Sequence, residues 1–237
     1  MIILFANNIP GSGKSTACLC LANAIYDLPG NDDMEMVVFD CDSSLPSLIK
    51  YKEATKHYKD PLFNYQMNSL DLSNEEMVNK TLLSILKKDG YYLFDITGGT
   101  KVESYLRILF SSDIILIPIQ PSKKEDPKFL DFLTYVLNLH FIIQTKTKGT
   151  GLRIMLVPIH LDKKDSGIEI NMNPDLPVKT LSPILFHEKL SDNIIPLKPD
   201  NESYTSYQDY LKDTIPYIQQ ISKQLQQQNK EQTYSEN

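Results

Sequence analysis

Residues 7–16 have the sequence Asn-Asn-Ile-Pro-Gly-Ser-Gly-Lys-Ser-Thr, between an apolar run at 2–6 and a helix-forming run at 17–24. A strand, a glycine-rich turn, Gly-Lys-Ser and a helix, in this order, are the context that a phosphate-binding P-loop requires. We expect the backbone N–H groups of residues 11–14 to converge on phosphate oxygens, helped by the positive end of the following helix. This stretch therefore predicts an α/β fold that binds a nucleotide.

Each residue type in the loop has a chemical reason. Gly11 and Gly13 allow bare backbone to approach the phosphates, Lys14 adds a point charge, and the Ser15 hydroxyl can coordinate Mg²⁺. The usual pattern begins with glycine where this chain has Asn8, and asparagine tolerates left-handed backbone angles better than most residues. The residues expected to hold the nucleotide are Pro10, Gly11, Ser12, Gly13, Lys14, Ser15 and Thr16.

The bulk composition is that of an ordinary globular protein. The chain has 237 residues, of which 41 % are hydrophobic and 23 % charged, and its net charge is −6. That charge argues against a dedicated nucleic-acid binder, although it leaves room for a local basic patch. The three cysteines have no disulfide or metal spacing, the first residues lack the features of a signal peptide, and no apolar stretch reaches the roughly 20 residues of a membrane span. These observations predict a cytoplasmic protein.

Strand-like and helix-like segments alternate along the chain. Continuous apolar strands separated by helices favour one doubly wound, mostly parallel sheet with helices on both faces. A capping box at 73–76 predicts one helix start and Asp126-Pro127 another, whereas 161–182 have the composition of a long irregular loop. The expected strands are 2–6, 36–40, 91–95, 113–119 and 152–158.

We expect one domain over residues 1–225, ending in a helix from about Ser206. Residues 226–237 are rich in glutamine and have nothing to bury, so they are expected to form a disordered polar tail.

Three carboxylates follow strands of the predicted sheet. Asp40 and Asp42 end the second strand and Asp95 ends the third, on the edge where open α/β sheets bind their ligands. We expect Asp95 to hold Mg²⁺ in the manner of a Walker B aspartate, together with Ser15 and Asp40. Asp42 is expected to position the attacking water. Lys14, Asp40 and Asp42 are then the candidate catalytic residues, although aspartates at strand ends also cap loops.

A second glycine-rich loop follows the third strand. The segment Thr97-Gly98-Gly99-Thr100 and the P-loop together contain four of the chain's nine glycines. This concentration predicts that Gly98 and Gly99 approach the γ-phosphate with bare backbone, as in a nucleotide-dependent switch.

Taken in order, these motifs resemble the ParA/MinD family of P-loop ATPases with deviant Walker A motifs. The similar segments are the P-loop, Asp40/Asp42, the Walker B strand ending at Asp95, and Ile117-Pro118-Ile119-Gln120-Pro121. The resemblance covers roughly residues 1–220. It implies ATP and Mg²⁺ as cofactors, a nucleotide-dependent homodimer, slow hydrolysis under the control of an activating partner, and a function in DNA partition or cargo positioning.

Two departures from the family pattern stand out. The family's signature lysine, which reaches the partner subunit's nucleotide, corresponds to Ile9, and the prolines that usually follow the Walker B aspartate are replaced by Thr97-Gly98-Gly99. The first departure predicts very slow turnover and a weak dimer. It also predicts that Ile9→Lys raises ATP-dependent dimerisation.

Other functions remain open at this point. A small-molecule P-loop kinase shares the loop sequence, but it needs arginines to clamp two phosphorylated substrates, and the chain has only Arg107 and Arg153. Asp95-Ile96-Thr97-Gly98 also fits the Asp-x-x-Gly loop of a GTPase, although no Asn-Lys-x-Asp guanine-binding motif follows the strand at 152–158. A nucleotide sensor that does not hydrolyse its ligand is the remaining alternative.

The partners are less clearly indicated. Membrane binding is not expected, because the end of the chain lacks a basic amphipathic helix. The resemblance suggests non-specific DNA binding, which would rely on the one group of basic residues in this chain. The same group can equally be a solvated surface. Its members are Lys146, Lys148, Arg153, Lys163 and Lys164.

Overall fold

The computed structural model describes residues 1–26, 34–42, 47–55, 65–97, 103–147, 153–160, 170, 172–181, 184–185, 216 and 219. Gly98 and Gly99, the predicted C-terminal helix apart from two positions, and the predicted tail at 226–237 lie outside these residues. The predicted domain boundary therefore stays a prediction.

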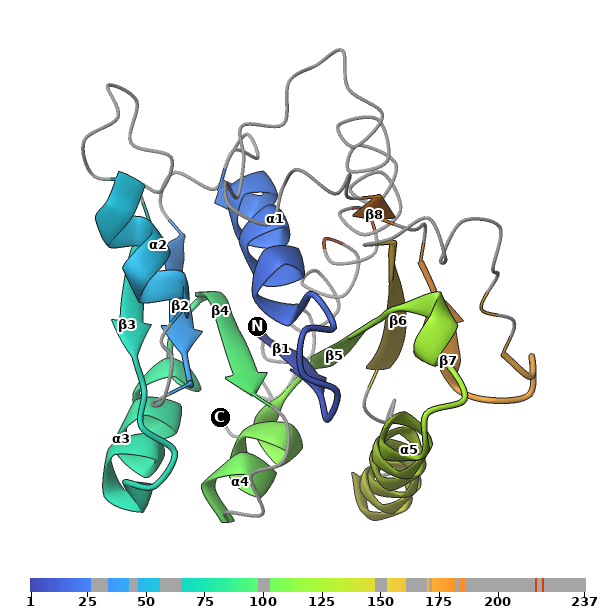
Figure 1. Ribbon diagram of the computed structural model, residues 1–237. Coiled ribbons are helices and arrows are strands. Elements are labelled where there is room, and N and C mark those ends of the chain that lie inside the picture. The colour runs from blue at the N-terminus through green and yellow to red at the C-terminus, as the bar shows by residue number, and fades with distance from the viewer. Residues whose placement is uncertain are drawn as a thin grey trace.

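Strands and helices alternate along the described chain, as Figure 1 shows. Their bounds, in order, are β1 (Ile2–Asn7), α1 (Lys14–Tyr26), β2 (Glu35–Asp40), α2 (Ser47–Thr55), β3 (Gln66–Ser69), α3 (Glu75–Ile85), β4 (Gly90–Thr97), α4 (Glu103–Ser111), β5 (Ile114–Ile119), the 3₁₀ turn η1 (Pro121–Lys123), α5 (Pro127–Thr147), β6 (Arg153–His160), β7 (Val178–Thr180) and β8 (Ile184–Leu185).

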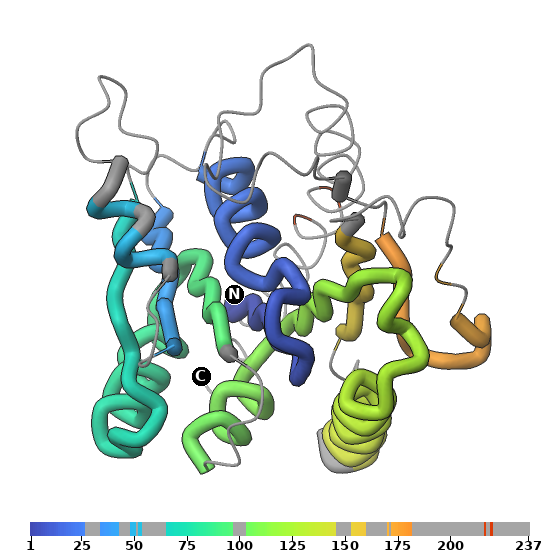
Figure 2. Tube along the Cα trace, viewed as in Figure 1, coloured from blue at the N-terminus to red at the C-terminus, as the bar shows by residue number. Residues whose placement is uncertain are grey.

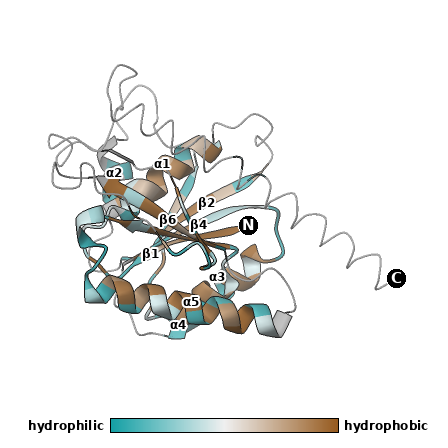
Figure 3. Ribbon diagram, turned by 90° about the vertical axis from the view of Figure 1, so that its right-hand side faces the viewer, coloured by the Kyte–Doolittle hydropathy of each residue, from teal (hydrophilic) through white to brown (hydrophobic). Residues whose placement is uncertain are grey.

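The strands form one parallel sheet in the order β3-β2-β4-β1-β5-β6-β7, and β8 pairs with the end of β6. Strand β1 therefore lies in the middle, between β4 and β5. Helices α1 and α2 cover one face and α3, α4 and α5 cover the other (Figure 3). This arrangement confirms the predicted doubly wound α/β fold.

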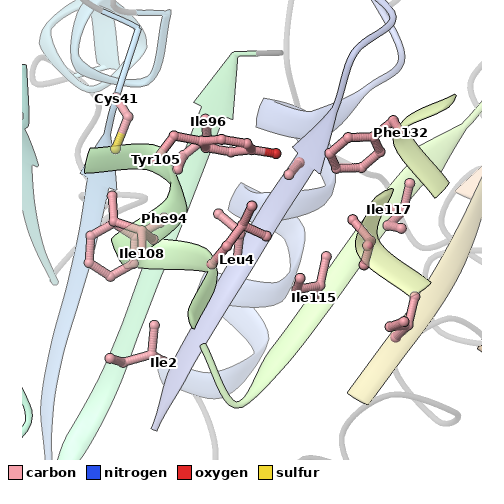
Figure 4. Close-up of a cluster of buried hydrophobic side chains, with 14 of the residues drawn as sticks. Ile2, Leu4, Cys41, Phe94, Ile96, Tyr105, Ile108, Ile115, Ile117 and Phe132 are labelled. Atoms are coloured by element: carbon pink, nitrogen blue, oxygen red, sulfur yellow. The ribbon is translucent and has the colours of Figure 1, made fainter. Parts of the chain in front are cut away.

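Strand alternation divides the core into two layers. Ile3 and Phe5 face α1, whereas Ile2 and Leu4 pack on the opposite side, and none of the four is more than 3 % exposed. Figure 4 shows Leu4 in this second layer with side chains from the neighbouring strands and from α4. Because both faces are covered, the central strands are continuously apolar, which is why the sequence predicted them well. None of the helices in the described part of the chain has the length and hydrophobicity needed to cross a bilayer.

Some details differ from the expectations. Strands β3, β7 and β8 were not predicted, and β7 lies inside the segment 161–182 that was expected to be irregular. Strands β3 and β7 are short, carry polar side chains and lie at the two ends of the strand order, so they lack the apolar pattern of a buried strand. The capping box is also wrong. Asn74 caps α3 by accepting a hydrogen bond from the Met77 N–H at 3.0 Å, whereas the Ser73 hydroxyl donates to Asp71.

Candidate functional site

The loop between β1 and α1 has the backbone that its glycines were predicted to permit. Gly11 has φ +67° and Gly13 has φ +85°, the left-handed region that other residues rarely adopt. A Cβ on Gly11 would meet open space, whereas a Cβ on Gly13 would lie 3.0 Å from Ile159 Cγ2 of β6. Glycine at position 13 is therefore favoured by the tight packing against Ile159 as well as by the backbone conformation. Figure 2 follows the chain from β1 through this turn into α1.

The loop has donors available for an anion. Among the described residues, the backbone N–H groups of Gly11 and Gly13 donate to no acceptor. The Lys14 ammonium folds back into the loop and donates to Ile9 O at 3.3 Å and to Ser12 Oγ at 3.4 Å. Burial lowers the pKa of Lys14, while Asp95 and Asp42 oppose that shift. The lysine is thus a desolvated cation in the same loop as these N–H groups, a combination that suits phosphate binding.

Two side-chain amides anchor the loop to strand β5. The Asn7 amide donates to Pro118 O at 2.6 Å, and its carbonyl oxygen accepts from the Ile9 N–H at 2.9 Å. On the other side of the loop, Gln120 Nε2 donates to Gly11 O at 3.1 Å. The end of β5 therefore holds the loop at two points. Neither anchor was predicted as a site residue, although Gln120 belongs to a segment already singled out.

Ser15 and Asp95 meet as a metal-binding pair would. The Ser15 hydroxyl, in the first turn of α1, donates to Asp95 Oδ2 at 2.6 Å. Asp95 is 4 % exposed within β4, next to β1 in the sheet. Burial raises the pKa of Asp95 to about 7; the hydrogen bond from Ser15 opposes the shift and the nearby Asp40 adds to it. A buried carboxylate of this kind favours a cation beside it.

Asp40 lies next to Asp95 in the register of β2 and β4, and it is fully buried. Its Oδ2 accepts the N–H groups of Leu48 and Ile49 at the start of α2, and its Oδ1 accepts the N–H of Asp42 at 3.2 Å. Burial raises the pKa of Asp40, and these backbone hydrogen bonds oppose the shift. Asp40 thus caps α2 in this structure, and its predicted role in the metal shell stays a prediction.

Asp42 is half-buried and follows β2 on the same edge. Burial lowers the pKa of Lys14 and raises that of Asp95; the negative charge of Asp42 opposes the first shift and adds to the second, so this charge lies near the loop. Its predicted role in positioning water remains untested. Among the described residues, no cluster of three or more His, Cys, Asp or Glu side chains could hold a metal by itself. A cation at Ser15 and Asp95 would therefore rely on the nucleotide for further ligands.

Ile9, which corresponds to the signature lysine of the ParA/MinD pattern, is buried. Its side chain is 3 % exposed and belongs to the core layer that contains Tyr105 and Phe129. A lysine here would have to bury its charge or leave the core, at a cost that the sequence alone did not reveal. The effect of Ile9→Lys on dimerisation stays a prediction, and the burial of Ile9 shows that the change would also disturb the packing under the loop.

The predicted basic group is only partly described. Arg153 is the first residue of β6 and is in register with the first residue of β5. It therefore lies at the amino ends of the strands, whereas the P-loop lies at their carboxyl ends. The side chains of the other members lie outside the described residues: Lys146, Lys148, Lys163 and Lys164.

Comparisons with known proteins agree with the fold. No protein-family model matches the chain, and no curated protein matches it significantly. Among solved structures, it is similar to a plasmid partition protein from Borrelia burgdorferi bound to AMPPNP (TM-score 0.57, 16 % identity, 91 % of this chain and 98 % of that one). It is also similar to the ATP complex of McdA from Cyanothece (0.58, 15 %, 90 % and 95 %) and to the cell division ATPase MinD from Pyrococcus furiosus (0.55, 16 %, 91 % and 98 %). The chain thus has the fold of the ParA/MinD ATPases.

Proposed function

We propose that this chain is a ParA-like switch that binds ATP, hydrolyses it slowly and works in DNA or plasmid partition or in positioning another cargo. One observation carries the proposal. A P-loop in which the Gly11 and Gly13 N–H groups have no acceptor among the described residues, and in which Lys14 is buried, lies beside the Ser15–Asp95 pair at the carboxyl edge of the sheet. The similar partition and division proteins, two of them solved with ATP or AMPPNP, support this choice of nucleotide and process.

The site residues take the following roles in this proposal. The N–H groups of residues 11–14 and the Lys14 ammonium bind the β- and γ-phosphates. Ser15 and Asp95 hold Mg²⁺, whose preferred ligands are hydroxyl, carboxylate and phosphate oxygens and which would neutralise charge on the phosphates. Asp42 orients the water and Asp40 supports the metal shell. Gly98 and Gly99 complete the site.

A phosphotransferase is supported less well, because its second phosphorylated substrate would need further cations. Arg107 donates a hydrogen bond to Asn79 and forms an ion pair with Glu103 on α4. Arg153 lies at the amino ends of the strands, away from the P-loop at their carboxyl ends. Neither arginine lies at the P-loop.

The proposed switch also includes an ATP-dependent homodimer, an activating partner protein and non-specific DNA. Light scattering with a non-hydrolysable ATP analogue and with ADP tests the dimer, and steady-state hydrolysis with and without duplex DNA tests the turnover. We expect a larger mass with the analogue alone and a basal rate on the order of one per minute or less, because these switches depend on added cations for speed. Rapid transfer of phosphate from ATP to a small molecule, with no change of mass, would favour the kinase instead.

A further inference from the structure

The P-loop of this chain has one cation. Lys14 is the only lysine or arginine between residues 1 and 26, and position 9 is filled by a buried isoleucine. Phosphoryl transfer by P-loop enzymes generally uses a further positive charge, supplied by the same chain or by another one, to stabilise the transition state. If the chain hydrolyses ATP as proposed above, that charge has to come from outside the loop.

The two arginines are held elsewhere. Arg107 makes hydrogen bonds of 2.6 Å to both Asn79 and Glu103. Arg153 begins β6, close to Asp113, which lies just before β5 at the amino end of the strands; burial raises the pKa of Asp113, and the charge of Arg153 opposes that rise. Within this chain, a lysine is therefore the remaining source of the second charge.

Lysines closely follow the residue after β5 that touches the loop. Strand β5 lies beside β1, and the next residue, Gln120, donates to Gly11 O at 3.1 Å. The Lys123 N–H donates to Gln120 O at 2.8 Å, which places Lys123 one 3₁₀ turn, about 6 Å along the axis, from the residue that touches the loop. Lys123 is half-buried, and among the described residues no carboxylate pairs with it.

We propose that Lys123 contacts the terminal phosphate of ATP bound in its own subunit and supplies the second cation of the site. This inference rests on the proposed function. In the reaction the water oxygen bonds to the γ-phosphorus while the bond to the ADP oxygen breaks, and the proton that the water loses goes to the released phosphate. The Lys123 ammonium keeps its proton throughout and offsets the charge that develops on the phosphoryl oxygens. Since ADP lacks the terminal phosphate, Lys123 should contribute to ATP binding and not to ADP binding.

The test compares Lys123→Ala with Lys123→Arg and with Lys124→Ala, which removes the same charge from the next residue. Calorimetry measures the affinity for ADP and for a non-hydrolysable ATP analogue, and a phosphate-release assay measures kcat. We expect Lys123→Ala to lower kcat by about 10²-fold or more and to remove the preference for the analogue over ADP, with ADP affinity and Tm unchanged. Lys123→Arg should keep most of the activity, and Lys124→Ala should resemble the wild type.

Two results would overturn the inference alone: a Lys123→Ala chain that keeps the wild-type kcat and preference, or a Lys124→Ala chain that loses as much. A wild-type chain that binds neither nucleotide would overturn the proposed function and the inference together.

Discussion

Asn7 is a fully buried asparagine at the end of β1, and we expect its replacement by alanine to weaken the fold and the loop together. Its amide donates to Pro118 O at 2.6 Å and accepts from the Ile9 N–H at 2.9 Å. Alanine would leave both backbone groups buried without a partner, at about 1–3 kcal/mol each. Since the loop can relax and water can enter the space of the amide, we expect a loss of about 2–4 kcal/mol in the free energy of unfolding.

Urea unfolding followed by far-UV circular dichroism measures this loss. Asn138→Ala is the matched control, because Asn138 is exposed on α5 and its removal should change stability by less than about 0.5 kcal/mol. ATP affinity should also fall for Asn7→Ala, since Ile9 and the start of the loop lose their anchor. If Asn7→Ala unfolds at the same urea concentration as the control, the anchoring role of Asn7 is refuted.

Three further predictions concern the site itself. Asp42→Ala should leave ATP binding intact and slow hydrolysis by about 10²-fold, and a wild-type rate of phosphate release would make Asp42 a loop residue only. Gly13→Ala should weaken ATP binding because its Cβ meets Ile159 at 3.0 Å and its φ is +85°, whereas equal affinity in calorimetry would contradict that packing argument. Burial raises the pKa of Asp95 to about 7, so the folded chain holds this proton more tightly than the unfolded chain. The stability of the nucleotide-free protein should then fall as the pH rises from about 4 to about 7, and Asp95→Asn should reduce that fall in a series of thermal melts.

The parts of the fold that the sequence predicted are those with a local cause. Strands β1 and β5 are continuous apolar runs because both of their faces are covered. The P-loop is recognisable because its glycines and Lys14 must stand at fixed spacings. The start of α5 follows from Asp126, whose carboxylate and carbonyl accept N–H groups of the first helical turn.

The features that were missed depend on residues far apart in the chain. The contacts of Asn7 with Pro118 and of Gln120 with Gly11 span more than a hundred residues, so no local pattern could reveal them. The burial of Ile9 likewise depends on helices that arrive later in the chain. Strand β7 pairs only because β6 presents an edge to it.

The most direct test of the central claim is calorimetric titration of ATP and Mg²⁺ into the wild-type chain and into Lys14→Ala, with GTP as the competing nucleotide. Among the described residues, Lys14 donates only to groups within its own loop, so its removal should leave the fold intact while the phosphates lose their principal cation. We predict Mg²⁺-dependent ATP binding to the wild type, a preference for ATP over GTP, and no measurable binding to Lys14→Ala at an unchanged Tm. Equal ATP affinity in the two chains would contradict the account, because the nucleotide would then be bound somewhere other than the P-loop.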